Sequence, residues 1–291
     1  MKEFQDRDAI LILSDMEGVS GLIDDRLLSS GGKFWMNYGR YLLTEDINAI
    51  ALSLCSKGIK RIYLSENHNF GRNVVVEELL PFITILPPHS ANTNMWGRSF
   101  WDELYRTKGI IGAIMVGFPG MAGAGGYLSH SWDNKIFEYI KINGEEYGAI
   151  GTTAALLGEY NIPVIAVIGD EAAAKEATKV NANITTVIVK KMSENNWISV
   201  LPPDIAHNLI SKKVSKALDN LPNIKPFKVR KPVKIEFKVK KEDYLNVIED
   251  KEEVKIDGKI IVIEASNYRE AYNIFWDSYL GILFGGTTWV M

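Results

Sequence analysis

The sequence predicts an α/β protein: a doubly wound, mostly parallel sheet followed by a second, smaller α+β domain. Short apolar runs alternate along most of the chain with longer segments whose apolar residues have helical spacing. This alternation is typical of a parallel sheet with helices on its faces. At about residue 200 the pattern changes, and strictly alternating residues then indicate strands with one face in water. At 291 residues the chain can form one large domain or two modest ones.

The main sheet is expected to contain six strands, because six short apolar runs are bounded by polar residues. These runs are residues 9–14, 60–65, 82–86, 112–117, 164–168 and 185–189. A helix is expected from about residue 35 to 57, with Gly58 in the position of a helix-terminating glycine. A second helix is expected over residues 171–178, where Asp170 is suited to cap the N-terminus.

The C-terminal part of the chain predicts a different mixture of elements. We expect a helix from Asp204 to about Leu218, strands at 228–230, 233–239 and 259–264, and a terminal helix over 267–283. The chain is therefore divided into residues 1–200, an α/β domain that carries the site, and residues 201–291, a smaller α+β domain.

Composition excludes several classes of partner. Apolar residues make up 46% of the chain and charged residues 24%, as in ordinary globular proteins. A net charge of −3 gives no reason to expect nucleic acid or an anionic membrane as a partner. No apolar run approaches the length of a membrane span. The single cysteine, Cys55, cannot form an internal disulfide, so we expect a reducing cytoplasm as the compartment.

Two acidic residues directly follow the first predicted strand. If the backbone stays extended, Asp15 and Glu17 lie on the same face, where their charges repel each other. A divalent cation would remove that repulsion, and carboxylate oxygens are suitable ligands for one. Alternatively, Asp15 caps a following turn while Glu17 is solvated. This motif alone leaves both explanations open.

Ligands in open parallel sheets bind beyond the carboxyl ends of the strands, and His68 follows the second strand there. By itself His68 could be a loop residue that binds backbone. Together with Asp15 and Glu17 it completes a carboxylate–carboxylate–imidazole set that suits zinc or manganese. Glu66 could add a further oxygen or support a ligand.

Three further histidines and a glycine-rich loop are the remaining candidates for functional residues. His130 lies just beyond the glycine-rich loop, residues 118–126, and is either a general acid/base or a packed strand histidine. His89 follows the third strand, and His207 lies on a helix face where a structural role is expected. The loop matches neither nucleotide-binding glycine pattern, so its glycines are better explained by close backbone approach to a metal or substrate.

Several ordered segments make the chain similar to the zinc-dependent D-aminopeptidase family, from about residue 9 to the C-terminus. The resemblance rests on residues 15–21 (DMEGVSG), 43–46 (LTED) with Asn48, the segment ending at His68, 129–131 (SHS), 169–177 (GDEAAAKEA) and 270–272 (EAY). The resemblance implies the doubly wound α/β domain and smaller second domain already expected. It also implies ring-like homo-oligomers.

The resemblance implies two zinc ions, of which this chain keeps the ligands for one. Asp15 matches the bridging aspartate, Glu17 the neighbouring glutamate, His68 the first histidine ligand and His130 the proposed catalytic histidine. The second histidine ligand is replaced in the sequence Gly117-Phe118-Pro119, and the glutamate ligand is replaced by Ala149. Both losses fall on the same ion, so a mononuclear site is expected. Whether Glu66, His89, Glu145 or Glu146 compensates is left open.

We therefore expect a metal-dependent hydrolase that cleaves a small peptide or amide, with one divalent metal, zinc by resemblance. Asp15, Glu17 and His68 would hold the metal, and His130 would assist proton transfer. The alternative is a non-catalytic relative that keeps the fold for ligand binding or assembly, which the lost ligands favour. A nucleotide-binding α/β protein is a third and weaker alternative.

Overall fold

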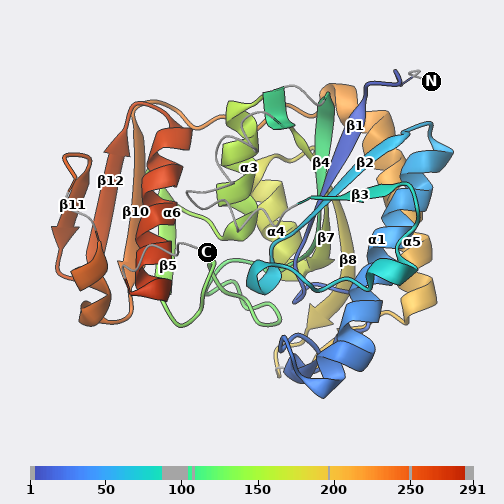
Figure 1. The fold of residues 1–291 in the computed structure, drawn as a ribbon, viewed down its shortest axis with the longest axis horizontal. Coiled ribbons are helices and arrows are strands. Elements are labelled where there is room, and N and C mark those ends of the chain that lie inside the picture. The colour runs from blue at the N-terminus through green and yellow to red at the C-terminus, as the bar shows by residue number, and fades with distance from the viewer. Residues whose placement is uncertain (1–3, 87–103, 107–108, 196, 249–250, 286–291) are drawn as a thin grey trace.

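The structure is a computed structural model that describes residues 4–86, 104–106, 109–195, 197–248 and 251–285. Its main sheet has seven strands in the order β3-β2-β1-β4-β7-β8-β9 (Figure 1). All neighbouring pairs are parallel except β8 and β9. The strands are β1 (Ala9–Ser14), β2 (Arg61–Glu66), β3 (Ile83–Ile85), β4 (Ile110–Phe118), β7 (Val164–Asp170), β8 (Thr185–Met192) and β9 (Ile198–Val200). All six predicted strands are therefore present, and the α/β fold class is confirmed.

The sheet is doubly wound because alternate residues of its strands face two different cores. In β1, Leu11 and Leu13 belong to one core cluster while Ile10 and Ile12 belong to the other. Two helices, α1 (Arg40–Ser56) and α5 (Pro203–Asn220), cover one face, and α3 (Ala149–Glu159) and α4 (Glu171–Val180) cover the other (Figure 1). The strand order reverses between β1 and β4, which is where ligands bind in such sheets.

Two helix ends have the predicted chemistry. Gly58 has a φ of +91°, a left-handed conformation that glycine adopts freely, and follows the end of α1. The Asp170 side chain accepts a hydrogen bond of 2.8 Å from the Ala173 N–H and so caps α4. The predicted helix over 35–57 begins with a π-helical turn, Trp35–Gly39, before α1.

A second, antiparallel sheet has the order β11-β12-β10-β5-β6, and α6 (Tyr268–Phe284) lies between this sheet and α3 (Figure 1). Its strands are β5 (Phe137–Ile142), β6 (Glu145–Glu146), β10 (Val233–Val239), β11 (Val254–Asp257) and β12 (Ile260–Ala265). Alternate residues of β10 are buried, as its sequence pattern predicts. No helix in the described ranges is both long and apolar enough to cross a membrane.

The two sheets divide the chain differently from the predicted boundary at residue 200. Strands β5 and β6 precede that boundary but belong to the second sheet, whereas α5 follows it and packs against α1 and β8 of the main sheet. Residues 228–230, predicted as a strand, are irregular, and no strand in the described part of the chain pairs with them. The division into residues 1–200 and 201–291 therefore stays a prediction about domains, and it does not separate the sheets.

Candidate metal centre

The ends of β1 and β2 bring the three predicted metal ligands together. The Asp15 N–H donates to the Val116 carbonyl at 2.8 Å, so the backbone stays extended for one residue beyond β1. The chain then turns over residues 16–19, and this turn rather than a continued strand brings the Glu17 carboxylate beside Asp15. The Met16 N–H donates to both carboxylates. His68 follows β2, the parallel neighbour of β1. Because adjacent parallel strands end at one edge, the imidazole reaches the two carboxylates.

The distances within this group are those expected around a small cation. The His68 Nδ1 lies 3.0 Å from Asp15 Oδ1 and 3.4 Å from Glu17 Oε1. Tetrahedral zinc with bonds of about 2.0–2.1 Å places its ligand atoms about 3.3 Å apart. One ligand atom from each residue lies within 4.8 Å of the others, and no second such group occurs in the described part of the chain. The donor set therefore fits one divalent metal.

A backbone contact orients the His68 ring for ligation. Its Nε2 lies 3.0 Å from the carbonyl oxygen of Leu28. A carbonyl can only accept, so this contact requires a proton on Nε2, and the Asn69 Nδ2 also lies 2.9 Å from that nitrogen. With a metal bound, the ring would be neutral and its Nδ1 would face the carboxylates and the ion. A second hydrogen-bonding partner of this kind is usual for histidines that bind metal.

Electrostatics show that the group requires positive charge. Burial raises the pKa of Asp15 to about 7, and the nearby Glu17 charge adds to the effect. Burial opposes charge on His68, but the carboxylates of Glu17 and Asp15 outweigh it and raise its pKa well above the ordinary value. Burial also opposes charge on Glu17, yet the His68 cation lowers the pKa of that carboxyl overall. The imidazolium thus occupies the electrostatic role that a metal ion would take.

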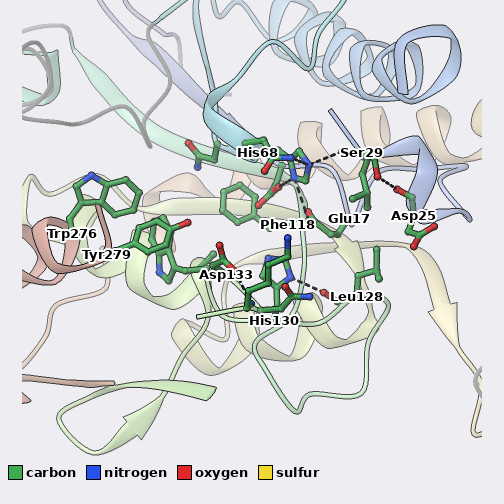
Figure 2. Close-up of a pocket in the computed structure, with 18 residues that line it drawn as sticks. Glu17, Asp25, Ser29, His68, Phe118, Leu128, His130, Asp133, Trp276 and Tyr279 are labelled. Carbon is green, nitrogen blue, oxygen red and sulfur yellow. Dashed lines mark hydrogen bonds and ion pairs between the residues drawn. The ribbon is translucent and has the colours of Figure 1, made fainter. Parts of the chain in front are cut away.

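His130 lines the same pocket as Glu17 (Figure 2). It lies between two residues with left-handed backbone, Leu128 with a φ of +52° and Trp132 with a φ of +62°. Such conformations are unusual for bulky side chains and occur often at functional sites. The Nδ1 of His130 lies 2.8 Å from the Leu128 carbonyl, so Nδ1 carries the proton and Nε2 can accept another.

The pocket has a volume of about 380 Å³, within the range of small-molecule sites. Figure 2 shows Asp25 and Ser29 toward one end, Trp276 and Tyr279 toward the other, and Glu17 and Phe118 between them. A short peptide could therefore contact the three candidate ligands and His130 within one cavity.

Three of the four residues considered as replacement ligands, Glu66, Glu145 and Glu146, do not line this pocket. Glu66 accepts the Asn73 N–H, and burial raises its pKa. Glu145 is exposed and pairs with Lys179 at 3.2 Å, and the neighbouring Glu146 is also exposed. His89 lies outside the described residues. Phe118 and Ala149 do line the pocket, but neither side chain has a metal-binding atom.

Sequence reasoning missed Lys190, a residue of β8 that is only 1% exposed. Its Nζ donates to the carbonyls of Glu17 at 2.6 Å and Leu22 at 2.8 Å, and lies 5.0 Å from the centre of the Tyr127 ring. The Tyr127 N–H in turn donates to Asp170 at 2.7 Å. Lys190 therefore connects the loop after β1 with the segment after the glycine-rich loop. Lys190 directly follows the predicted strand 185–189 and precedes a second lysine, Lys191, so the sequence gives no signal that one of the two is buried.

The fold and site define an α/β protein with a candidate metal centre at the reversal point of its sheet, and comparisons identify its family. A family model described as D-aminopeptidase matches residues 9–276. The D-aminopeptidase of Bacillus subtilis (strain 168) is 30% identical over 267 residues, which cover 89% of this chain and 92% of that protein. The chain therefore belongs to the D-aminopeptidase family, as its sequence motifs predict.

A solved structure has the same fold. It is described as the Zn-dependent D-aminopeptidase DppA from Bacillus subtilis, a self-compartmentalizing protease. The TM-score is 0.84 at 24% sequence identity, and the match covers 97% of this chain and 99% of that one. The likeness confirms the expected architecture over almost the whole molecule.

Proposed function

We propose that this protein is a mononuclear, metal-dependent aminopeptidase that cleaves a small peptide or amide. The observation that carries the proposal is the convergence of Asp15, Glu17 and His68 in one pocket with His130. The D-aminopeptidase family and the zinc dependence of the structural relative favour zinc as the metal and D-peptides as substrates.

Asp15, Glu17 and His68 would hold the metal and leave positions open to solvent or substrate. A bound ion would polarise the scissile carbonyl and lower the pKa of water at the site. The Nε2 of His130, kept free by the contact of Nδ1 with Leu128, can take a proton from the attacking water. The same nitrogen can then return the proton to the leaving amine.

A single ion is proposed because the second set of family ligands is missing. Phe118 and Pro119 stand where the resemblance places a histidine ligand, and Ala149 stands where it places a glutamate. The same losses favour the alternative, a non-catalytic relative that binds a ligand or assembles without turnover. The two functions differ in whether any amide substrate is hydrolysed.

Turnover of D-alanyl dipeptides by zinc-loaded protein separates these functions. Hydrolysis that disappears in Asp15→Ala together with zinc binding would support the metallohydrolase. Zinc binding without hydrolysis across a panel of D- and L-dipeptides would support the non-catalytic alternative. Lys191→Met, which removes an exposed side chain outside the pocket, serves as the control for handling and metal loading.

We also propose that the chain forms a homo-oligomer in the cytoplasm. The structural relative is described as self-compartmentalizing, and the single cysteine suits a reducing compartment. Light scattering of the full chain should give a mass several times 32.6 kDa, whereas a monomer mass would contradict the assembly.

A further inference from the structure

One end of the pocket has a different chemistry from the candidate metal centre. Five of the residues that line the pocket are apolar or aromatic, namely Phe118, Trp132, Ala149, Trp276 and Tyr279. Asp133 is the charged neighbour of Tyr279 on the side toward His130. Trp276 and Tyr279 come from α6 and lie together at this end in Figure 2, with Phe118 between them and Glu17. The aromatic end and the candidate ligands are therefore parts of one cavity.

The aromatic wall is held by packing and by a hydrogen bond. The Trp132 ring lies 5.0 Å from that of Trp276 in an edge-on arrangement, and Trp276 lies 5.2 Å from Tyr279. The Trp132 Nε1 donates to Thr152 Oγ1 at 2.9 Å, which ties the ring to α3. Such a wall is already formed before a ligand arrives, so a ligand side chain would bind with little reorganisation.

Ala149, the first residue of α3, supplies the smallest side chain in this group. A methyl group here leaves room that a glutamate would fill and adds no charge. The resemblance predicts a metal-binding glutamate at this position, and its replacement turns a polar part of the pocket into an apolar one. Burying an apolar side chain against such surfaces is favourable in proportion to the area removed from water.

We propose that this end of the pocket is a subsite for a bulky aliphatic or aromatic side chain of the peptide, next to the scissile bond. The location of this subsite next to the scissile bond rests on the proposed function. The subsite shares its cavity with Asp15, Glu17 and His68, which would hold the metal at the bond. The substrate class is then a short peptide with a large apolar residue rather than one made only of alanine or glycine.

The test compares D-Ala, D-Leu and D-Phe, placed separately at each position of a dipeptide. At one position, kcat/KM for D-Leu or D-Phe should exceed that for D-Ala by about 10–100-fold. Ala149→Leu should fill the subsite and reduce this preference to less than about threefold. Ala182→Leu, the same substitution at an exposed residue outside the pocket, should keep the full preference.

A binding measurement keeps this inference separate from the proposed function. Titration calorimetry should show that zinc-treated protein binds D-phenylalaninamide at least about tenfold more tightly than D-alaninamide, and that Ala149→Leu removes the difference. Selective binding without hydrolysis would support the subsite while contradicting the peptidase. Equal binding of both amides, or a side-chain preference unchanged in Ala149→Leu, would overturn the subsite.

Discussion

Lys190 extends the support of the candidate metal centre beyond the three ligands. Its Nζ binds the backbone carbonyl of Glu17 and not its carboxylate, so the lysine positions the loop while the side chain stays free for metal. Burial lowers the pKa of Lys190 to about 8, which shows the cost of keeping a charge there. Such a cost is acceptable because the carbonyls of Glu17 and Leu22 satisfy the ammonium group.

Lys190→Met should weaken zinc binding about 10–100-fold, as changes in residues that orient metal ligands commonly do. The substitution also leaves the buried carbonyls of Glu17 and Leu22 unpaired. Each unpaired carbonyl should lower the free energy of unfolding by about 1–3 kcal/mol. Zinc titration and chemical unfolding measure the two effects. The matched control is Lys191→Met, which loses only an exposed pair with Glu171 at 3.1 Å. Equal zinc affinity in both variants would contradict the positioning role.

His130 should act in turnover and not in metal retention. His130→Gln keeps a hydrogen-bonding side chain but removes the titratable nitrogen, so kcat should fall about 10²–10⁴-fold. Zinc content should stay at the wild-type value, because Asp15, Glu17 and His68 are unchanged. A variant that loses zinc as well would show that His130 is a ligand.

His207 forms a structural ion pair, in line with the role expected for it from its helix position. Its Nε2 lies 3.2 Å from an oxygen of Asp46, whose carboxylate is fully buried and also accepts two hydrogen bonds from Ser20. The hydrogen bond and charge of Asp46 raise the pKa of His207. Because the folded pKa lies above the unfolded value near 6.5, the pair stabilises the protein below about pH 6.5 and loses this effect as pH rises through the folded pKa. Urea unfolding should therefore show a larger loss in His207→Gln at pH 6 than at pH 9, of about 1 kcal/mol at most. The same loss at both pH values would rule out a charged pair.

At the scale of elements, the end of β4 must pass very close to the loop that carries Asp15. Gly117 has a φ of +79°, and a Cβ there would lie 2.0 Å from the Asp15 carbonyl oxygen. The register of β4 against β7 also shifts between Val116 and Phe118. Gly117 is thus required by both its conformation and its surroundings, next to a candidate ligand.

Gly117→Ala should destabilise the protein by more than about 3 kcal/mol, because backbone strain and a clash with backbone add together. Gly123→Ala is the matched control, since Gly123 has a similar φ of +77° but nothing within 4 Å of the added Cβ. It should cost only about 1–2 kcal/mol of strain. Similar thermal unfolding of the two variants would show that the close approach is unimportant.

Local pattern predicted the elements whose partners are close in the sequence or whose periodicity is strong. The six strands of the main sheet are short and apolar, and their parallel order places Asp15, Glu17 and His68 at one edge. Strand β5 was missed because Glu138 and Lys141 interrupt its apolar run, so neither a continuous apolar segment nor a strict alternation marks it. Its partner β10 lies about 95 residues further along, with Ile140 opposite Phe237. Residues 228–230 alternate like a strand but pair with no strand among the described residues, which shows that alternation alone is insufficient.

The whole molecule is held by a core that spans both sheets. One cluster contains Leu11 and Met115 of the main sheet together with Phe237 of the second sheet and Tyr268 and Phe275 of α6. Because the sheets share this core, a boundary at residue 200 would cut through packed elements on both sides.

The fragment 1–200 should therefore fail to fold cooperatively. It lacks β10, which pairs with β5, and α5, whose Ile210 and Val214 pack on the main sheet. Exposed apolar surface should then give dye binding and a weak near-ultraviolet dichroism signal, with the full chain as control. A sharp two-state transition of the fragment would instead establish residues 1–200 as an independent domain.

Zinc content per chain tests the central claim most directly. After zinc dialysis without chelator and gel filtration, the wild-type protein should retain about one equivalent and Asp15→Ala less than about a tenth. Less than about a tenth in the wild type would contradict a metal centre built from Asp15, Glu17 and His68. Two tightly bound equivalents would contradict a mononuclear site.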